Sequence, residues 1–169
     1  MRSGSKIAFT LVEVLIVVII LAIIATIVLP RFSNASAAAR ASMLADDLRI
    51  LRTQIVVFKG QHRDVPPGYP GCDPNAAPTE AAFGQYMTQA SNANGDFGEP
   101  GSPGFHGPYF REIPLNPVNQ KRTIEMVGDG EPFPANADDS HGWIYQPSTL
   151  TLKADATGSN EFGKAFIDY

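Results

Sequence analysis

The three histidines and the single cysteine of this 169-residue chain are the first side chains to consider for chemistry. His62, His106 and His141 lie in three separate loop contexts, and none has a nucleophile at a spacing typical of a catalytic pair. Cys72 has no second cysteine, which excludes an intrachain disulfide. It could be a reactive thiol, pair between chains, or be a loop residue without a function. The sequence therefore predicts no enzyme.

A second group of candidates is acidic. Asp129, Asp138 and Asp139, together with Ser140, could supply the hard oxygen ligands that calcium prefers. No EF-hand spacing accompanies them, and acidic turn residues are usually only solvated. Both interpretations stay open, and calcium is the only cofactor that the sequence suggests.

The remaining candidate is a carboxylate inside an apolar segment that runs from Ile7 to Leu29. Three polar side chains interrupt this segment: Thr10, Glu13 and Thr26. As a helix it would extend about 35 Å, enough to cross a bilayer core. An ionised carboxylate at membrane depth costs roughly 2.5 to 3.5 kcal/mol, so Glu13 needs a cationic partner. The nearest are Lys6 and an α-amino group that would exist only after a cut just before Phe9.

The residues around Glu13 match a known signal. The run Lys6-Ile7-Ala8-Phe9-Thr10-Leu11-Val12-Glu13, the apolar helix behind it and Pro30 resemble the class III signal of type IV pilins and type II secretion pseudopilins. The resemblance implies that a prepilin peptidase cuts between Ala8 and Phe9 and that Phe9 is then N-methylated. Glu13 would be the assembly glutamate, and Pro30 the helix-bending proline. The family usually has Gly before the cut, where this chain has Ala8.

The resemblance implies a structural role. The chain would be a subunit of a type IV pilus-like filament, closest to a major type II secretion pseudopilin, because many pilins close a disulfide that Cys72 alone cannot form. Its partners would be further copies, other pilins or pseudopilins, the peptidase, and an inner-membrane assembly platform with a cytoplasmic ATPase. The major pseudopilins also use a calcium site in the general region of the three aspartates.

Charge and hydropathy predict a topology. Arg2 and Lys6 precede the apolar segment and should stay cytoplasmic, which places the chain after Pro30 outside. We expect a single pass through the inner membrane with a periplasmic domain, and later a periplasmic or cell-surface filament. The net charge of −4 gives no reason to expect nucleic-acid binding.

The predicted fold class is α+β and pilin-like, with one long N-terminal helix packed on a small antiparallel sheet. The predicted parts are a leader at 1–8, a transmembrane half-helix at 9–30, an amphipathic half-helix at 31–60 and a globular domain at 61–169, with loops at 61–121 and the sheet at 122–169. An apolar stripe of helical period marks the second half-helix: Leu44, Leu48, Leu51, Ile55 and Phe58. A second line, Met43, Ile50 and Val57, either widens this buried face or meets another subunit.

The globular domain has its own local signals. A short helix should follow Pro78, with an apolar face from Ala82 to Ala90. Residues 92–107 show no apolar pattern and predict a loop. Strands are expected at 122–127, 142–145 and 149–154, the last two as a hairpin, and the sheet should cover the helical stripe.

Other classes compete with the filament subunit. One is a signal-anchored periplasmic binding module that keeps an uncut membrane helix. Another is a secretory signal peptide cut near Ala35-Ser36-Ala37, although its apolar core should be shorter. Neither accounts for Glu13. Within the family, an adhesion, motility or DNA-uptake pilin also stays open.

Overall fold

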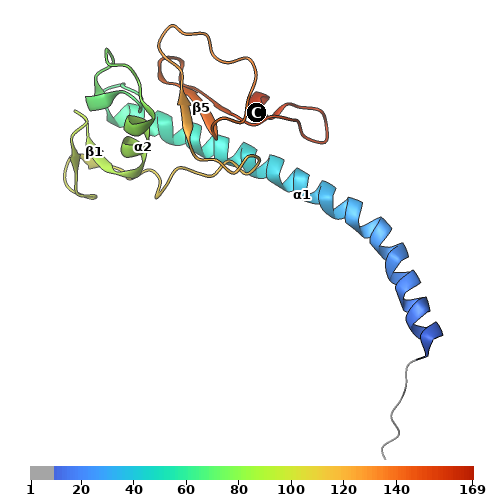
Figure 1. Cartoon of the computed structure of the whole chain (residues 1–169). Helices are drawn as coiled ribbons and strands as arrows, with labels where there is room; N and C mark the ends of the chain where they lie inside the picture. The colour runs from blue at the N-terminus through green and yellow to red at the C-terminus, as the bar shows by residue number, and fades with distance from the viewer. Residues whose placement is uncertain (1–9) are drawn as a thin grey trace, which may run out of the picture. The chain divides into compact units, whose positions relative to one another are not determined.

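The computed structural model describes residues 10–169, and it describes side chains at 10–26 and 36–169. The chain is an α+β protein (Figure 1) that divides into two compact units, Met1–Ala37 and Ala38–Tyr169. Its helices are α1 (Leu11–Gln61) and α2 (Glu80–Thr88), with short 3-10 helices η1 (Pro70–Cys72), η2 (Pro147–Thr149) and η3 (Phe166–Asp168). Its strands are β1 (Ala90–Asn92), β2 (Phe97–Gly98), β3 (Phe105–His106), β4 (Ile124–Met126), β5 (Trp143–Gln146) and β6 (Thr151–Ala154).

The first unit contains the beginning of α1, which has an apolar and exposed surface. From Leu11 to Ile24 the large apolar side chains expose between 49% and 83% of their surface. Within the described residues, no helix is both long and apolar enough to cross a membrane.

Two predictions are contradicted by this finding. The first is the transmembrane first half of the helix, which was part of the predicted pilin-like fold. The second is the single-pass location in the inner membrane with a periplasmic domain, because that location depends on a membrane-crossing helix.

The second unit is built around α1 from Ala38 onward. All five residues of the predicted apolar stripe are buried, with exposed fractions of 0 or 1%. They form one core with residues of α2, β4, β5 and β6, whose largest members are Phe83, Tyr86, Met87, Trp143, Tyr145 and Leu152. The expected packing of the stripe on the sheet is thus confirmed.

The second apolar line on α1 has a different environment. Met43, Ile50 and Val57 expose 57%, 44% and 39% of their surface. The line therefore does not widen the buried face of its own domain. Contact with another subunit stays a prediction.

The segment after α1 is more regular than the sequence predicts. The short helix after Pro78 is confirmed as α2, and the Thr79 side chain accepts a hydrogen bond from the Ala82 amide at its N-terminus. The expected loop at 92–107 is wrong, because β1, β2 and β3 form an antiparallel sheet in the order β2-β1-β3. Strands of two or three residues are too short to show an alternating pattern.

The second sheet has the order β4-β5-β6. The predicted hairpin is confirmed, with β5 and β6 antiparallel and Tyr145 opposite Leu152. The all-antiparallel sheet is wrong, because β4 and β5 are parallel, with Glu125 opposite Ile144. Parallel neighbours need a long crossover connection, and residues 127–142 provide it.

Polar contacts fasten the edges of this sheet. The Arg52 guanidinium of α1 donates to the Leu152 carbonyl through Nε at 3.1 Å and Nη2 at 2.7 Å, and to the Tyr169 carbonyl at 3.1 Å. The Trp143 indole donates to the Pro114 carbonyl at 3.0 Å, and the buried Asn116 amide donates to the Gly142 carbonyl at 2.7 Å. The Pro-rich segment at 107–117 is thereby attached to β5.

Two neighbouring residues of α1 provide a test of this packing. Leu51→Ala should lower the free energy of unfolding by about 2 to 5 kcal/mol, because the side chain is fully buried and its loss leaves a cavity. Ile50→Ala, on the exposed side, should change it by no more than about 0.5 kcal/mol. Urea denaturation measures both values, and equal losses would contradict this orientation of the helix.

Candidate functional site

The predicted processing residues are only partly within the described chain. Ala8 and Phe9, the predicted cleavage and methylation residues, lie outside the described residues. Pro30 falls inside α1, but its side chain is not described. Glu13 lies in the first turn of α1 and is exposed. Its local geometry is therefore the part of the predicted signal that the structure describes.

Thr10 and Glu13 form the N-terminal cap of α1. The Glu13 amide donates to the Thr10 side-chain oxygen at 3.2 Å and to the Thr10 carbonyl at 3.1 Å. Threonine at the cap and glutamate three residues later is the capping-box pattern, in which the glutamate can return a hydrogen bond to the cap amide. A carboxylate in the first turn also interacts favourably with the helix dipole, by about 0.3 to 1 kcal/mol. Glu13 thus has a structural role within its own helix.

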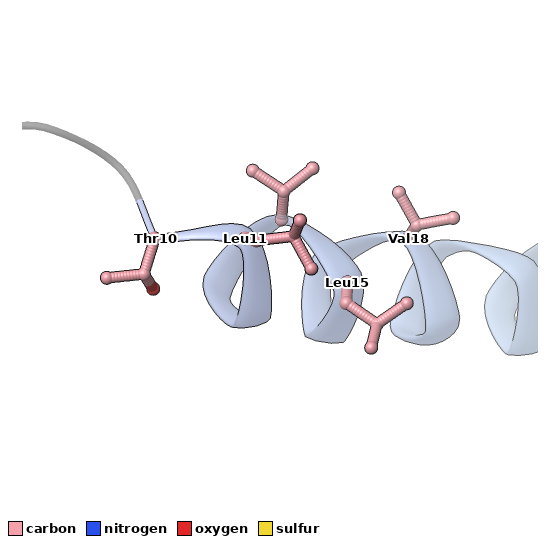
Figure 2. A pocket seen from close by; sticks show the side chains of 5 residues that line it. Thr10, Leu11, Leu15 and Val18 are labelled. Carbon is pink, nitrogen blue, oxygen red and sulfur yellow. The ribbon is translucent and has the colours of Figure 1, made fainter.

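An apolar recess follows the cap on the same helix (Figure 2). It has a volume of about 500 Å³, and its lining residues recur at helical spacing: Thr10, Leu11, Val14, Leu15 and Val18. Glu13 is not among them. The apolar residues of this face are thus available for packing against another helix, with the carboxylate outside the recess.

The three predicted calcium ligands have separate partners. The Tyr69 hydroxyl donates to both carboxylate oxygens of Asp129, at 2.8 and 2.9 Å. Burial and the adjacent carboxylate raise the pKa of Tyr69 above its ordinary value. Asp139 accepts hydrogen bonds from the amide and the hydroxyl of Thr157, and Asp138 accepts one from the Ser140 amide at 2.8 Å.

Hydrogen bonds from Ser140 lower the pKa of Asp138, and those from Thr157 lower the pKa of Asp139, so both carboxylates favour the ionised form. In the described part of the chain, however, the three aspartates do not form a group whose ligand atoms lie within 4.8 Å of one another. Calcium binding by these residues stays a prediction.

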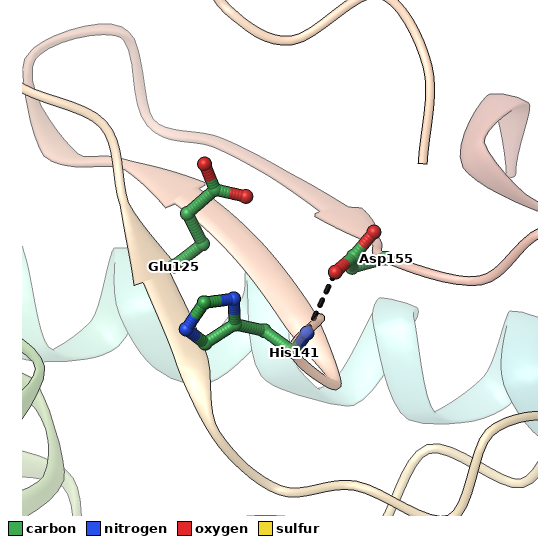
Figure 3. A group of neighbouring side chains, drawn as sticks. All are labelled: Glu125, His141 and Asp155. Atoms are coloured by element: carbon green, nitrogen blue, oxygen red, sulfur yellow. Dashed lines mark hydrogen bonds between the residues drawn. The ribbon is translucent and has the colours of Figure 1, made fainter. Parts of the chain in front are cut away.

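Among the described residues, a different group of possible metal ligands meets this 4.8 Å criterion (Figure 3). Ligand atoms of Glu125 on β4, His141 before β5 and Asp155 after β6 all lie within 4.8 Å of one another. Figure 3 shows the Asp155 carboxylate directed at the His141 backbone amide, which donates to it at 2.7 Å. Sequence analysis missed this group, because its members come from three separate segments.

Asp155 is fully buried and already has four hydrogen-bond donors. Its Oδ1 accepts from the amides of Asp138 and Asp139 at 2.8 and 3.2 Å, and its Oδ2 accepts from the Ser140 hydroxyl at 3.1 Å and the His141 amide. An ionised carboxylate offers about four lone-pair sites, so these donors occupy all of them. Asp155 organises the loop at 138–141, and a metal ion would have to displace its bonds.

The serine beside His141 does not form a nucleophile and base pair. Ser140 Oγ lies 2.8 Å from His141 Nδ1, but its single hydroxyl proton is directed at Asp155. While the Ser140 hydroxyl donates to Asp155, the imidazole nitrogen is the donor in its contact with Ser140. In that arrangement the imidazole does not act as a general base toward the Ser140 hydroxyl.

Cys72 lies half-buried in η1, where burial raises the pKa of its thiol. A raised pKa disfavours the thiolate, which is the nucleophilic form of cysteine. The thiol at this position is therefore not activated.

Comparisons of the chain with protein-family models, curated proteins and solved structures find no match.

Asp155→Ala provides a test of the loop-organising role. In EDTA, we expect the free energy of unfolding to fall by about 3 to 5 kcal/mol, because several buried donors lose their acceptor. Glu125→Ala, from the same group, should change it by no more than about 0.5 kcal/mol. Urea denaturation with EDTA or with added calcium measures both. A loss that occurs for Asp155→Ala only when calcium is present would instead indicate a metal ligand.

Proposed function

We propose that the chain is a structural subunit of a self-assembling filament of the type IV pilus class, most similar to a type II secretion pseudopilin. The observation that carries the proposal is the run from Lys6 to Glu13, with a Phe at the implied cut and a glutamate four residues after it. A cut before Phe9 leaves Thr10 as the second residue of the new chain, so the N-cap of α1 follows directly after the new terminus.

The exposed surface of the first unit supports this proposal. Leu11, Val14, Leu15 and Val18 lie around one recess, and each exposes at least half of its surface. Burying apolar surface contributes roughly 25 cal/mol per Å², so contact with apolar helices of other copies would stabilise an assembly. Contiguous exposed apolar surface of this kind is typical of an interaction site.

The charges at the N-terminus also support assembly with other copies. Peptide-bond hydrolysis before Phe9 would create an α-amino group, which is protonated at neutral pH. A cation near the N-terminus of a helix opposes the helix dipole, so it gains from a nearby carboxylate. Glu13 is that carboxylate, in the same chain or in a neighbouring copy. Cleavage would thus create a cationic partner for Glu13.

The second unit has a core of its own, which suits a domain carried on the filament. Its core residues on α1 are fully buried by α2 and the β4-β5-β6 sheet. The apolar line of Met43, Ile50 and Val57 remains exposed on the other side of α1, where another copy could contact it. Self-assembly therefore requires no rearrangement of this core.

The terminus is the first test. Mass spectrometry of the protein purified from its native host should find a chain that begins at an N-methylated Phe9 and lacks residues 1–8. A chain that begins at Met1 would favour a signal-anchored binding module. A chain that begins near Ala38 would favour a cleaved secretory signal, and either result would contradict the proposal.

A variant series separates helix capping from charge pairing. Glu13→Gln keeps a capping-box residue but removes the charge, Glu13→Ala removes both, and Thr10→Ser is the matched control that keeps the cap. We expect all three to be processed. Filaments should decrease by about tenfold or more for both Glu13 variants, because an uncompensated amino group remains, and should be unchanged for Thr10→Ser.

Electron microscopy and subunit crosslinking count the filaments in each variant. Normal filament formation by Glu13→Gln would disprove the charge-pairing account, while leaving the capping role and the filament assignment in place.

A further inference from the structure

His62 directly follows the last residue of α1 and is fully buried. Its ring stacks on Phe58, one helical turn earlier, with 3.7 Å between ring centroids and 5° between planes. Tyr86 of α2 and His106 of β3 flank the ring, with centroids 6.3 and 6.2 Å away. His62 therefore lies where α1, α2 and the β2-β1-β3 sheet meet.

Both ring nitrogens of His62 have a hydrogen-bond partner. Nδ1 lies 2.9 Å from the Phe58 carbonyl oxygen, which can only accept, so Nδ1 carries a proton. Nε2 lies 2.8 Å from the hydroxyl of Ser91, a fully buried residue of β1. In the neutral ring, Nε2 accepts the Ser91 proton. The neutral imidazole thus connects the end of α1 to β1.

Among the described residues, the groups that contact the His62 ring include no carboxylate. The titratable side chains around it are Tyr86 from α2, His106 from β3 and Tyr109 from the segment after β3, which packs on Phe58. Burial raises the pKa of both tyrosines to about 12, so they are neutral near pH 7.

Three charged groups lie next to His62 in the chain and have other partners. Lys59 pairs with the exposed Asp64 at 3.3 Å, and Arg63 donates to the Asn94 side chain at 3.1 Å. A charged imidazole would therefore be buried without an adjacent anion.

We propose that His62 is an acid-sensitive latch, which in its neutral form holds the β2-β1-β3 sheet against the end of α1 and when protonated releases it. Protonation converts Nε2 from an acceptor into a donor, so the Ser91 hydroxyl must rotate and direct its own proton elsewhere. The buried charge also loses hydration without gaining an ion pair. The His106 ring lies 6.2 Å from the His62 ring, so a positive charge on both would be repulsive.

The β2-β1-β3 sheet would separate from the end of α1 as one unit. Ser91 pairs with Phe97 of β2 and with His106 of β3, so it occupies the centre of the sheet. Loss of its bond to His62 removes a direct connection between β1 and the helix end. The second sheet, which packs on the stripe of α1 elsewhere, would keep its contacts.

The sign of the pH dependence follows from the location of the proton. Burial is the largest cause of the lowered pKa of His62 in the closed state, and hydrogen bonds to Phe58 and Ser91 partly offset it. The exposed imidazole has an ordinary pKa of about 6.5, so below that pH the open state binds a proton that the closed state does not. The latch is fully stable above about pH 6.5 and weakens as the pH falls. One proton limits the change to about tenfold per pH unit.

Hydrogen exchange of the full chain is the experiment. Peptides that cover β1, β2 and β3 should show an opening equilibrium constant that rises between pH 7.5 and pH 5.5, by up to about tenfold per pH unit below 6.5, after correction for intrinsic exchange rates. His62→Gln, which is neutral throughout, should lose this dependence. His141→Gln, beside the other sheet, should retain it.

A second measurement covers the case in which His62→Gln fails to fold. NMR titration of the wild-type imidazoles, assigned with His106→Gln and His141→Gln, should show that His62 titrates below pH 6.5. Titration of His62 at or above pH 6.5, or protection of the small sheet that does not change with pH, would overturn the proposal.

Discussion

The apolar stripe on the second half of α1 is the constraint on which the second unit depends. A helix that carries Leu44, Leu51 and Phe58 on one side has to bury that side, and full burial of each such residue contributes about 1.5 to 3 kcal/mol. The short strands could not supply a core alone, since none of those in the described chain exceeds four residues. The helix supplies one continuous apolar surface, and α2 and the sheet supply the aromatic residues that cover it.

Buried polar groups determine how the long connections close this core. Arg52 of α1 binds the carbonyls of β6 and the C-terminal residue, and Asp155 gathers the loop that leads into β5. Such groups must keep their partners, because a buried donor or acceptor without one costs about 1 to 3 kcal/mol. The Tyr145 hydroxyl is the exception among the described side chains, since it is buried without a hydrogen-bond partner.

An element of this fold could be predicted from the sequence where its pattern lies within one segment, and could not where it depends on distant segments. The α1 stripe and the face of α2 were predictable because helical periodicity repeats within one segment, and Thr79 marked the start of α2. The hairpin of β5 and β6 was predictable for a similar reason. The parallel pairing of β4 and β5 was not, because it depends on the path of residues 127–142 rather than on any local pattern.

The candidate sites were likewise predictable only where their residues lie close together in the sequence. Glu13 was found because an acidic residue in an apolar run is a local anomaly. The cap formed by Thr10 and Glu13 was also predictable, since the Thr-x-x-Glu spacing is present in the sequence. The Asp155 contacts were not predictable. Three of its four hydrogen-bond donors are backbone amides, which almost any residue type provides. Two of the residues around His62, Ser91 and His106, lie 29 and 44 positions away in the sequence, so its full environment exists only in the folded chain.

The cap on α1 has a consequence for which sequences this position can tolerate. The capping-box pattern accepts glutamate or glutamine at position 13, because either side chain is long enough to accept a hydrogen bond from the cap amide. The proposed pairing with an amino group accepts only an acid. Glutamate alone belongs to both sets, so drift at this position would be confined to a single amino acid even where each requirement, taken separately, leaves a choice of two.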